Sequence, residues 1–201
     1  MRLVLASNNA KKLVELQTLF APLGLELVTQ GSLGIAEAEE PHITFVENAL
    51  LKARHAAQHA RAAAIADDSG LCVDALSGAP GVLSARYATL FGRAKGDDEN
   101  NRVLLEQLAD RADRRARFVS ALVAVRSADD PEPLIAFGRW EGEVLRDPRG
   151  AGGFGYDPLL FIPSLNSSVA ELSAEVKNSH SHRAIASRQM LVLMREVWCL
   201  G

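Results

Sequence analysis

The sequence predicts a single α/β domain over residues 1–201, in which helices flank a mixed β-sheet. Short apolar runs typical of strands alternate with stretches in which apolar residues recur at helical spacing. Two longer extended segments, at 118–125 and 134–144, predict an antiparallel strand pair. The chain contains no internal repeat, low-complexity tract or obvious linker. A mixed sheet flanked by helices is the simplest architecture that fits these observations.

Local signals set the order of the elements. Apolar periodicity marks the helices, and Pro or Gly marks their ends and the turns. The first half predicts a strand at 3–6, a helix at about 13–20, a strand at 25–28, a helix from a Thr44 cap to about 62, a short strand at 64–66 that leads directly into Asp67 to Gly70, and an extended segment at 71–73. The second half predicts a turn at 78–81, a helix at 97–108, the strand pair with a charged connection at 126–132, a glycine-rich loop at 150–158, and helical pieces at 169–172 and 184–197.

Composition limits the classes of function. The net charge is −3 and 48% of the residues are apolar, so a core can form but no basic field exists for long nucleic acid. Local lysines and arginines must therefore hold any phosphorylated ligand. The two cysteines, Cys72 and Cys199, are too few for a disulfide framework and indicate a reducing compartment. No secretory segment and no apolar run of about 18 residues appears, so we expect a cytoplasmic protein that does not span a membrane.

A polar segment follows the first strand and opens the first helix. It reads Ser7, Asn8, Asn9, Ala10, Lys11 and Lys12. Helix N-termini present unpaired N–H groups that favour phosphate, and Lys12 adds a positive charge. The segment contains no glycine, so it is not a P-loop. On its own it also fits an ordinary helix cap.

Two acidic pairs are candidates for metal chemistry. Asp67 and Asp68 follow a buried strand, where adjacent carboxylates are costly unless a cation or hydrogen bonds compensate them. Successive side chains of a strand point to opposite faces, so we expect only one of the two to face a given metal. An Asx turn closed by Gly70 is the structural alternative. Magnesium favours carboxylates combined with phosphates and water, so Glu40, of the Glu39–Glu40 pair, is a second candidate ligand, although a solvated acidic loop fits as well.

Three further groups carry polar or flat side chains. In the loop at 152–158, glycines permit close approach, Phe154 offers a flat face and Asp157 accepts hydrogen bonds. In the segment at 177–183, Lys177, His182 and Arg183 can donate to phosphate or to a carbonyl oxygen, and basic residues at a helix start indicate an anionic or acceptor-rich ligand. His55 and His59 have zinc-like spacing but no third ligand nearby, so we interpret them as structural or surface residues.

Taken together, the motifs are recognisable. The chain resembles the inosine/xanthosine triphosphate pyrophosphatase family, the non-canonical purine nucleoside-triphosphate pyrophosphatases. Six segments carry the resemblance in the order of the family and span essentially the whole chain: SNNAKK at 7–12, TFVENALLKA at 44–53, DDSGLCVDA at 67–75, GAPGVLSARY at 78–87, GGFGYDP at 152–158 and SHR at 181–183.

The resemblance implies an elongated mixed sheet with two lobes, a central active-site cleft, a homodimer, and hydrolysis of a nucleoside triphosphate to the monophosphate and pyrophosphate. Glu40 and Asp68 would bind Mg²⁺, and Asp68 would be the general base. The triphosphate would be held by Ser7, Asn8, Asn9, Ala10, Lys11, Lys12 and Lys52. The nucleoside would be bound by Ser69, Phe154, Gly155, Tyr156, Asp157, Lys177, His182 and Arg183.

Base preference follows from hydrogen bonding. Donors from His182 or Arg183 suit the O6 carbonyl of hypoxanthine or xanthine, whereas the amino group of adenine would leave them unpaired. His180 stands where the family usually has an apolar residue, so it either points outward or alters local packing. Two alternatives stay open: a Maf-like pyrophosphatase acting on pyrimidine or modified nucleotides, and a nucleotide sensor without catalysis.

Overall fold

The computed structural model describes residues 2–200 of the chain. These residues form two compact units, each assembled from separate stretches of sequence. Unit 1 comprises Met1–Asp68, Ser120–Gly138 and His182–Gly201, and unit 2 comprises Ser69–Val119 and Arg139–Ser181.

The strands form one mixed sheet, as the sequence predicts. Its order is β2-β1-β3-β4-β5-β6-β7. Strand β1 pairs in parallel with β2 and β3, whereas β6 pairs antiparallel with β5 and β7. The strands are β1 (Arg2–Leu5), β2 (Glu26–Thr29), β3 (Ala64–Val73), β4 (Arg115–Val125), β5 (Leu134–Val144), β6 (Leu160–Ile162) and β7 (Ser167–Ser168). The α-helices are α1 (Ala10–Phe20), α2 (Phe45–Ala60), α3 (Asp97–Gln107), α4 (Ala174–His180) and α5 (His182–Val197). Short 3₁₀ helices lie at Ala21–Leu23, Gly31–Leu33, Asp74–Leu76, Pro163–Leu165 and Val169–Glu171, and a longer 3₁₀ segment, Gly81–Phe91, is interrupted by non-helical backbone at Arg86.

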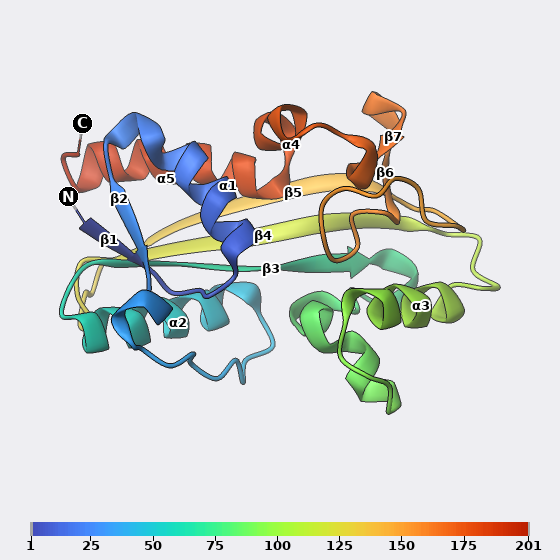
Figure 1. The fold of residues 1–201 in the computed structure, drawn as a ribbon, viewed down its shortest axis with the longest axis horizontal. Coiled ribbons are helices and arrows are strands. Elements are labelled where there is room, and N and C mark those ends of the chain that lie inside the picture. Colours follow the sequence, from blue (N-terminus) through green and yellow to red (C-terminus); the bar gives the residue numbers. More distant parts are fainter. Residues whose placement is uncertain (1, 201) are drawn as a thin grey trace. The chain divides into compact units, whose positions relative to one another are not determined.

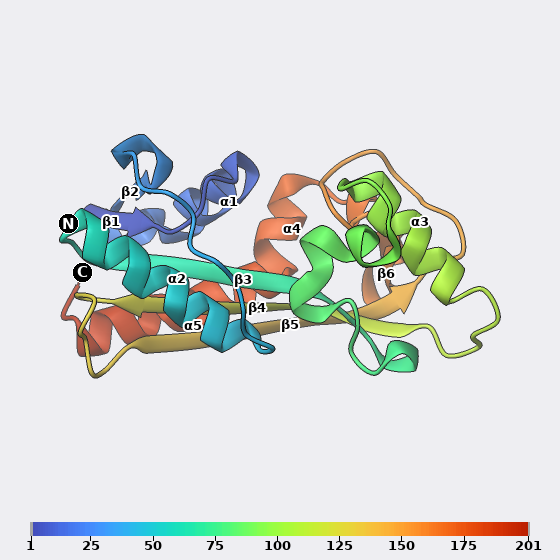
Figure 2. The ribbon, with the colours of Figure 1, turned by 90° about the horizontal axis from the view of Figure 1, so that it is seen from below.

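In unit 1 the alternation of strand side chains divides the core into two halves. Leu5 and Ile65 pack with α1 and α5, whereas their neighbours Ala6 and Ala66 pack with the alanine-rich face of α2. Figure 1 shows α1 and α5 on one side of these strands and α2 on the other, and Figure 2 shows α2 from the side that it covers. Each side chain of β3 in this unit therefore faces one of two sides: the side covered by α1 and α5, or the side covered by α2.

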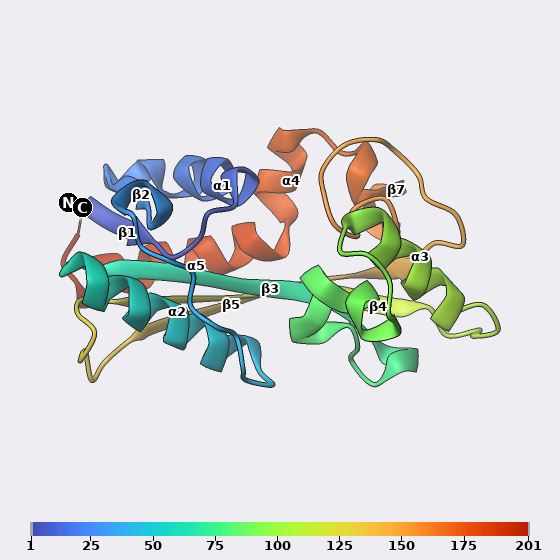
Figure 3. The ribbon, with the colours of Figure 1, turned by 60° about the horizontal axis from the view of Figure 1, so that its bottom comes forward.

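Unit 2 has its own apolar core. Leu71 of β3, Phe118 of β4 and Trp140 of β5 pack with Leu104 of α3 and Leu160 of β6. The 3₁₀ segment Gly81–Phe91 lies beside α3 (Figure 3). Within α3, the buried Asn100 accepts a hydrogen bond from the backbone N–H of Ala88 at 2.8 Å, which fastens the two segments together.

Strand β3 differs from the sequence-based expectation. Asp67 to Gly70 are part of one continuous strand, so the Asx turn is wrong. A Cβ on Gly70 would lie 2.4 Å from both the Gly81 carbonyl oxygen and the Ser84 hydroxyl. Glycine is present because another backbone approaches the strand here, and not because the chain turns.

The helical expectations are confirmed for α1, α2, α3, α5 and the 3₁₀ helix Val169–Glu171, and Thr44 caps α2 by accepting from the Glu47 N–H. The helix α4 was not expected. Because α4 ends at His180 and α5 begins at His182, the basic segment 177–183 does not open a single helix. Within residues 2–200, no helix combines the length and apolar character needed to cross a bilayer.

Candidate active site

Asp67 and Asp68 point to opposite faces of β3. The carboxylate of Asp67 lies on the α1 and α5 side, where its Oδ2 is 2.9 Å from the Lys12 ammonium and 3.2 Å from Arg183 Nε. Its Oδ1 accepts a hydrogen bond from Ser120 of β4 at 2.7 Å. Arg183 also pairs with Glu15 of α1. Two acidic and two basic side chains thus balance their formal charges in a buried network.

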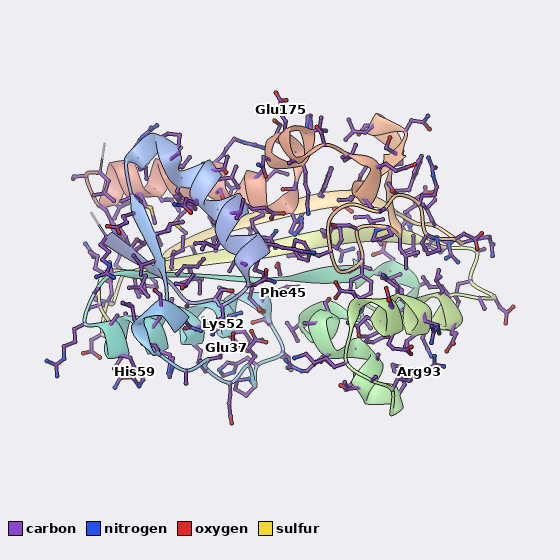
Figure 4. The ribbon with its side chains drawn as sticks, in the orientation of Figure 1. Glu37, Phe45, Lys52, His59, Arg93 and Glu175 are labelled. Atoms are coloured by element: carbon purple, nitrogen blue, oxygen red, sulfur yellow. The ribbon has the colours of Figure 1, made fainter. Side chains whose placement is uncertain are left out.

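The carboxylate of Asp68 lies on the α2 side. Its Oδ1 accepts from the Lys52 ammonium at 2.7 Å, and Lys52 also donates to Glu40 Oε1 at 2.6 Å and to the Asp67 carbonyl oxygen at 3.1 Å. Figure 4 shows Lys52 on α2. One ammonium therefore serves two carboxylates, and the formal charge of these three side chains is negative.

Burial and charge shift the pKa values in the two groups differently. For Asp67, burial favours the neutral acid, but Lys12, Arg183 and the Ser120 hydrogen bond outweigh it and hold the pKa well below its usual range. For Asp68, burial exceeds the opposing effect of Lys52, so the pKa is raised. Burial lowers the pKa of Lys52, but Asp68 and Glu40 outweigh it and raise the pKa.

The Asp68 group fits a hard divalent cation. The second carboxylate oxygen of Asp68, Oδ2, is buried and has no hydrogen-bond partner among the described residues. Such an oxygen is costly to bury unless a cation or a donor reaches it. Magnesium uses one or two carboxylates and completes its shell with water and phosphate oxygens. The described residues contain no group of three or more His, Cys, Asp and Glu that would form an all-protein metal cage.

The segment at 7–12 lies where the sequence predicts, between β1 and α1. Asn9 is the N-cap and its side-chain oxygen accepts from the N–H groups of Lys11 and Lys12. Ser7 Oγ accepts from the Asn9 N–H at 3.2 Å. Asn8, Ala10 and Lys11 are exposed, whereas Lys12 is half-buried and turns its ammonium to Asp67. Lys12 therefore links the first turn of α1 to the buried Asp67 carboxylate.

In unit 2 the loop at 150–158 is organised around Asp157. The buried Asp157 carboxylate accepts from the Phe154 N–H and from the Lys177 ammonium, both at 2.9 Å. The same ammonium lies 4.6 Å from the centroid of the Phe154 ring. Tyr156 is buried and donates its hydroxyl hydrogen to the Ser84 carbonyl oxygen at 2.9 Å. A Cβ on Gly153 would lie 2.1 Å from Asp157 Oδ2, so only glycine fits beside this carboxylate.

The remaining residues from the sequence analysis are distributed between the units. Ser69 is half-buried in the unit 2 part of β3. Lys177 belongs to unit 2, whereas His182 and Arg183, both buried, belong to unit 1. The guanidinium of Arg183 is bound by Asp67 and Glu15, so it is part of the Asp67 network rather than an exposed donor.

The histidines outside these groups have structural contacts. The rings of His55 and His59 lie 4.3 Å apart, and a ring nitrogen of each contacts a backbone carbonyl oxygen. Figure 4 shows His59 toward the C-terminal end of α2. His180 is exposed on α4, with Nδ1 at 3.0 Å from the Val176 carbonyl oxygen, so it points outward.

Two members of the Asp67 network and two contacts of the loop were not predicted from the sequence. Ser120 is a lone polar residue within an apolar strand, which is a usable signal for a buried hydrogen bond. Glu15 lies one helical turn after Lys12. Asp97 and Asn101, which bind the backbone of Gly155, are one turn apart on α3 and carried no signal at the sequence level.

These groups define an α/β protein equipped to handle a phosphorylated ligand with paired carboxylates and lysines. Residues 3–193 match the Ham1 family. A dITP/XTP pyrophosphatase of Methylibium petroleiphilum is 69% identical over 98% of this chain and 99% of its own length. One from Leptothrix cholodnii is 67% identical over the whole of both chains. A solved HAM1 protein from Coxiella burnetii superimposes with a TM-score of 0.90 at 44% identity, over 98% of this chain and 100% of that one. The chain belongs to the Ham1 family.

Proposed function

We propose that this protein hydrolyses non-canonical purine nucleoside triphosphates, dITP, XTP and ITP, to the monophosphate and pyrophosphate. The single observation that carries the proposal is the Asp68 carboxylate: Lys52 holds one oxygen, and the second is buried with no hydrogen-bond partner among residues 2–200. The names of the two closely similar relatives support this substrate class.

The residues of the Asp68 group have distinct tasks in this reaction. The Asp68 carboxylate accepts a proton from the water that attacks the α-phosphorus and so acts as the general base. Lys52 holds Oδ1 and so orients the carboxylate. The new bond joins the water oxygen to the α-phosphorus, and the bond from the α-phosphorus to the bridging oxygen breaks and releases pyrophosphate.

Asp68 and Glu40 would hold the divalent cation, for which Mg²⁺ is our choice. When bound, it neutralises charge on the triphosphate. Lys11, Lys12 and the N–H groups at the start of α1 would contribute positive charge for the phosphates, and the neutral residues Ser7 to Ala10 would complete the phosphate-binding segment. The Lys12 ammonium lies 2.9 Å from the Asp67 carboxylate, so it is held in place before the substrate arrives.

The nucleoside is assigned to the loop at 150–158. Phe154 offers a ring face for the base, and Lys177 and Asp157 keep that ring in place. Ser69, Gly155, Tyr156, His182 and Arg183 complete the assigned set. Arg183 binds Glu15 and Asp67, so we expect it to influence binding through the Asp67 network as well.

The test is pyrophosphate release from ITP, XTP, dITP, GTP, ATP and dTTP, measured with Mg²⁺ and with EDTA. We expect metal-dependent turnover of ITP, dITP and XTP well above that of GTP and ATP. Turnover mainly of dTTP would favour the Maf-like alternative. Tight ITP binding by folded protein without pyrophosphate release would favour the sensor.

Three further parts of the proposal have their own measurements. Replacing Mg²⁺ with Mn²⁺ or Ca²⁺ tests the identity of the cation. Sedimentation equilibrium tests the homodimer. Fractionation of the cells that make the protein tests its cytoplasmic location, which the two free cysteines favour.

A further inference from the structure

The loop at 150–158 has an attachment that none of the proposed substrate contacts explains. Asp97, the first residue of α3, accepts a hydrogen bond from the Gly155 N–H at 2.7 Å. Asn101, one turn further along α3, donates its side-chain N–H to the Gly155 carbonyl oxygen at 3.0 Å. Both polar groups of one residue, Gly155, are thus bound by one face of one helix.

This attachment lies next to the ring that is assigned to the base. Phe154 precedes Gly155, and Tyr156 and Asp157 follow it. Asp157 binds the Phe154 N–H on one side, and the α3 pair binds Gly155 on the other. The direction of the Phe154 ring therefore depends on two sets of hydrogen bonds, of which only the Asp157 set lies within the loop itself.

The conformation of Gly155 explains why an external attachment is needed. Its φ is +62°, and a Cβ built there would meet no atom within 4 Å. The glycine is thus needed for its backbone conformation and not for space. Glycine visits many other conformations readily, so the hydrogen bonds from α3 are what hold this one.

The helix that supplies the attachment is itself firmly placed. Val103 and Leu104 of α3 are buried in the unit 2 core, and Asn100 binds the Ala88 N–H. The other amide atom of Asn101, Oδ1, is buried and has no partner among the described residues. Burial of an unpaired oxygen has a cost, and the structure tolerates it at the residue that fastens the loop.

We propose that Asp97 and Asn101 are positioning residues for nucleoside binding, which hold the Phe154 ring ready for the base by fixing the Gly155 backbone. The inference rests on the proposed function, because it assumes that the loop binds the nucleoside. It assigns no contact with the substrate to either residue.

The test compares Asp97→Ala and Asn101→Ala with the control Asp98→Ala. Asp98 is the exposed neighbour of Asp97 on the same helical turn. Inhibition by IMP reports on the nucleoside, and inhibition by pyrophosphate reports on the phosphates. We expect KM for ITP and the inhibition constant for IMP to rise about tenfold in both variants, as loss of one hydrogen bond predicts. The inhibition constant for pyrophosphate stays within about twofold, since these changes leave the lysines of unit 1 in place.

A conservative variant separates positioning from simple loss of stability. Asp97→Asn keeps an oxygen that accepts from Gly155, and we expect its KM to return most of the way to the wild-type value. In hydrogen exchange, residues 152–157 should exchange faster in Asn101→Ala, while residues 100–107 of α3 keep their protection. Equal rises in the IMP and pyrophosphate constants, or no rise in either, would overturn the inference.

Failure of the proposed function gives a different result. If the wild type does not hydrolyse ITP, the substrate assignment is wrong. The inference itself is then tested by exchange alone: IMP protection of residues 152–157 in the wild type that is lost in Asn101→Ala supports it. Identical exchange in the two proteins contradicts it.

Discussion

Asp67 and Asp68 are adjacent on β3, yet their carboxylates bind different lysines, Lys12 of α1 and Lys52 of α2. The alternation of a strand separates two like charges that would repel each other on one face. It also produces two different environments, one with balanced charges and one with an excess carboxylate. Only the second has an oxygen available for a cation, which is why the catalytic role is assigned to Asp68.

Asp68→Asn tests that assignment. The amide keeps the shape of the side chain but is not a base and does not carry the charge. We expect kcat for ITP to fall about 100- to 10,000-fold, the usual contribution of a general base, while ITP still binds in equilibrium measurements. Asp110→Asn, at an exposed position after α3, is the control and should keep wild-type turnover. Wild-type turnover in Asp68→Asn would remove Asp68 from the mechanism.

Replacing each of two fully buried serines with alanine should change stability differently. Ser120 donates to Asp67, whereas Ser187 Oγ has no partner among the described residues. Ser120→Ala leaves a buried carboxylate one donor short and should lower the free energy of unfolding by about 1–3 kcal/mol. Ser187→Ala removes an unpaired hydroxyl from α5 and should be neutral or slightly stabilising. Urea denaturation of both variants checks this, and equal losses would argue against the Asp67 network as a source of stability.

Gly138 of β5 is predicted to tolerate no side chain. A Cβ there would lie 1.7 Å from the His182 carbonyl oxygen, at the start of α5. Because backbone has to move, Gly138→Ala should destabilise by about 3 kcal/mol or more. Gly34→Ala is the comparison, since its φ of +70° costs only left-handed strain, about 1–2 kcal/mol, with no atom within 4 Å of the added carbon. Thermal melts that rank Gly34→Ala as the more damaging change would contradict this packing of β5 and α5.

The connection between β4 and β5 should contribute stability that depends on pH. The carboxylate of Asp130 is buried and accepts from the Arg126 side chain and from the N–H groups of Arg126 and Glu132. The hydrogen bond from the Arg126 side chain is the largest cause that lowers the pKa of Asp130, and the two N–H groups add to it. Together they lower this pKa to about 2. The pKa of an aspartate in the unfolded chain is about 3.9, so the folded state binds the Asp130 proton more weakly than the unfolded state does.

It follows that the stabilisation is present above about pH 4 and is lost as the pH falls through about 2. Asp130→Asn should therefore be less stable than the wild type at pH 7 by about 1–3 kcal/mol. The difference should shrink in urea titrations at successively lower pH from 4 to 2. A difference that stays constant over this range would show that the charge of Asp130 does not matter. Asp129→Asn, at the exposed neighbouring position, should show no such trend.

Much of the site could be predicted because its signals are local. The Thr44 cap, the helix after Asn9 and the opposite directions of Asp67 and Asp68 all follow from neighbours a few residues apart. Strand β3 was harder, because Gly70 looks like a turn until the approach of Ser84, 14 positions later, is known.

The long-range partners were beyond local patterns. Arg183 binds Asp67 and Glu15, which lie 116 and 168 positions away in sequence. Sequence alone predicted Arg183 as a donor to a ligand, since its acidic partners are brought to it only by folding. The same holds for Asn101, whose partner Gly155 is 54 positions away.

The chain passes from one unit to the other at four places: after Asp68, Val119, Gly138 and Ser181. Neither unit is a continuous stretch of sequence, and the first and last segments both belong to unit 1, so truncation from either end removes part of unit 1 first. A chimera that exchanges one unit with a relative needs four junctions, three of them inside β3, β4 and β5. New substrate preferences are therefore easier to reach by point substitution within a unit than by recombination of segments.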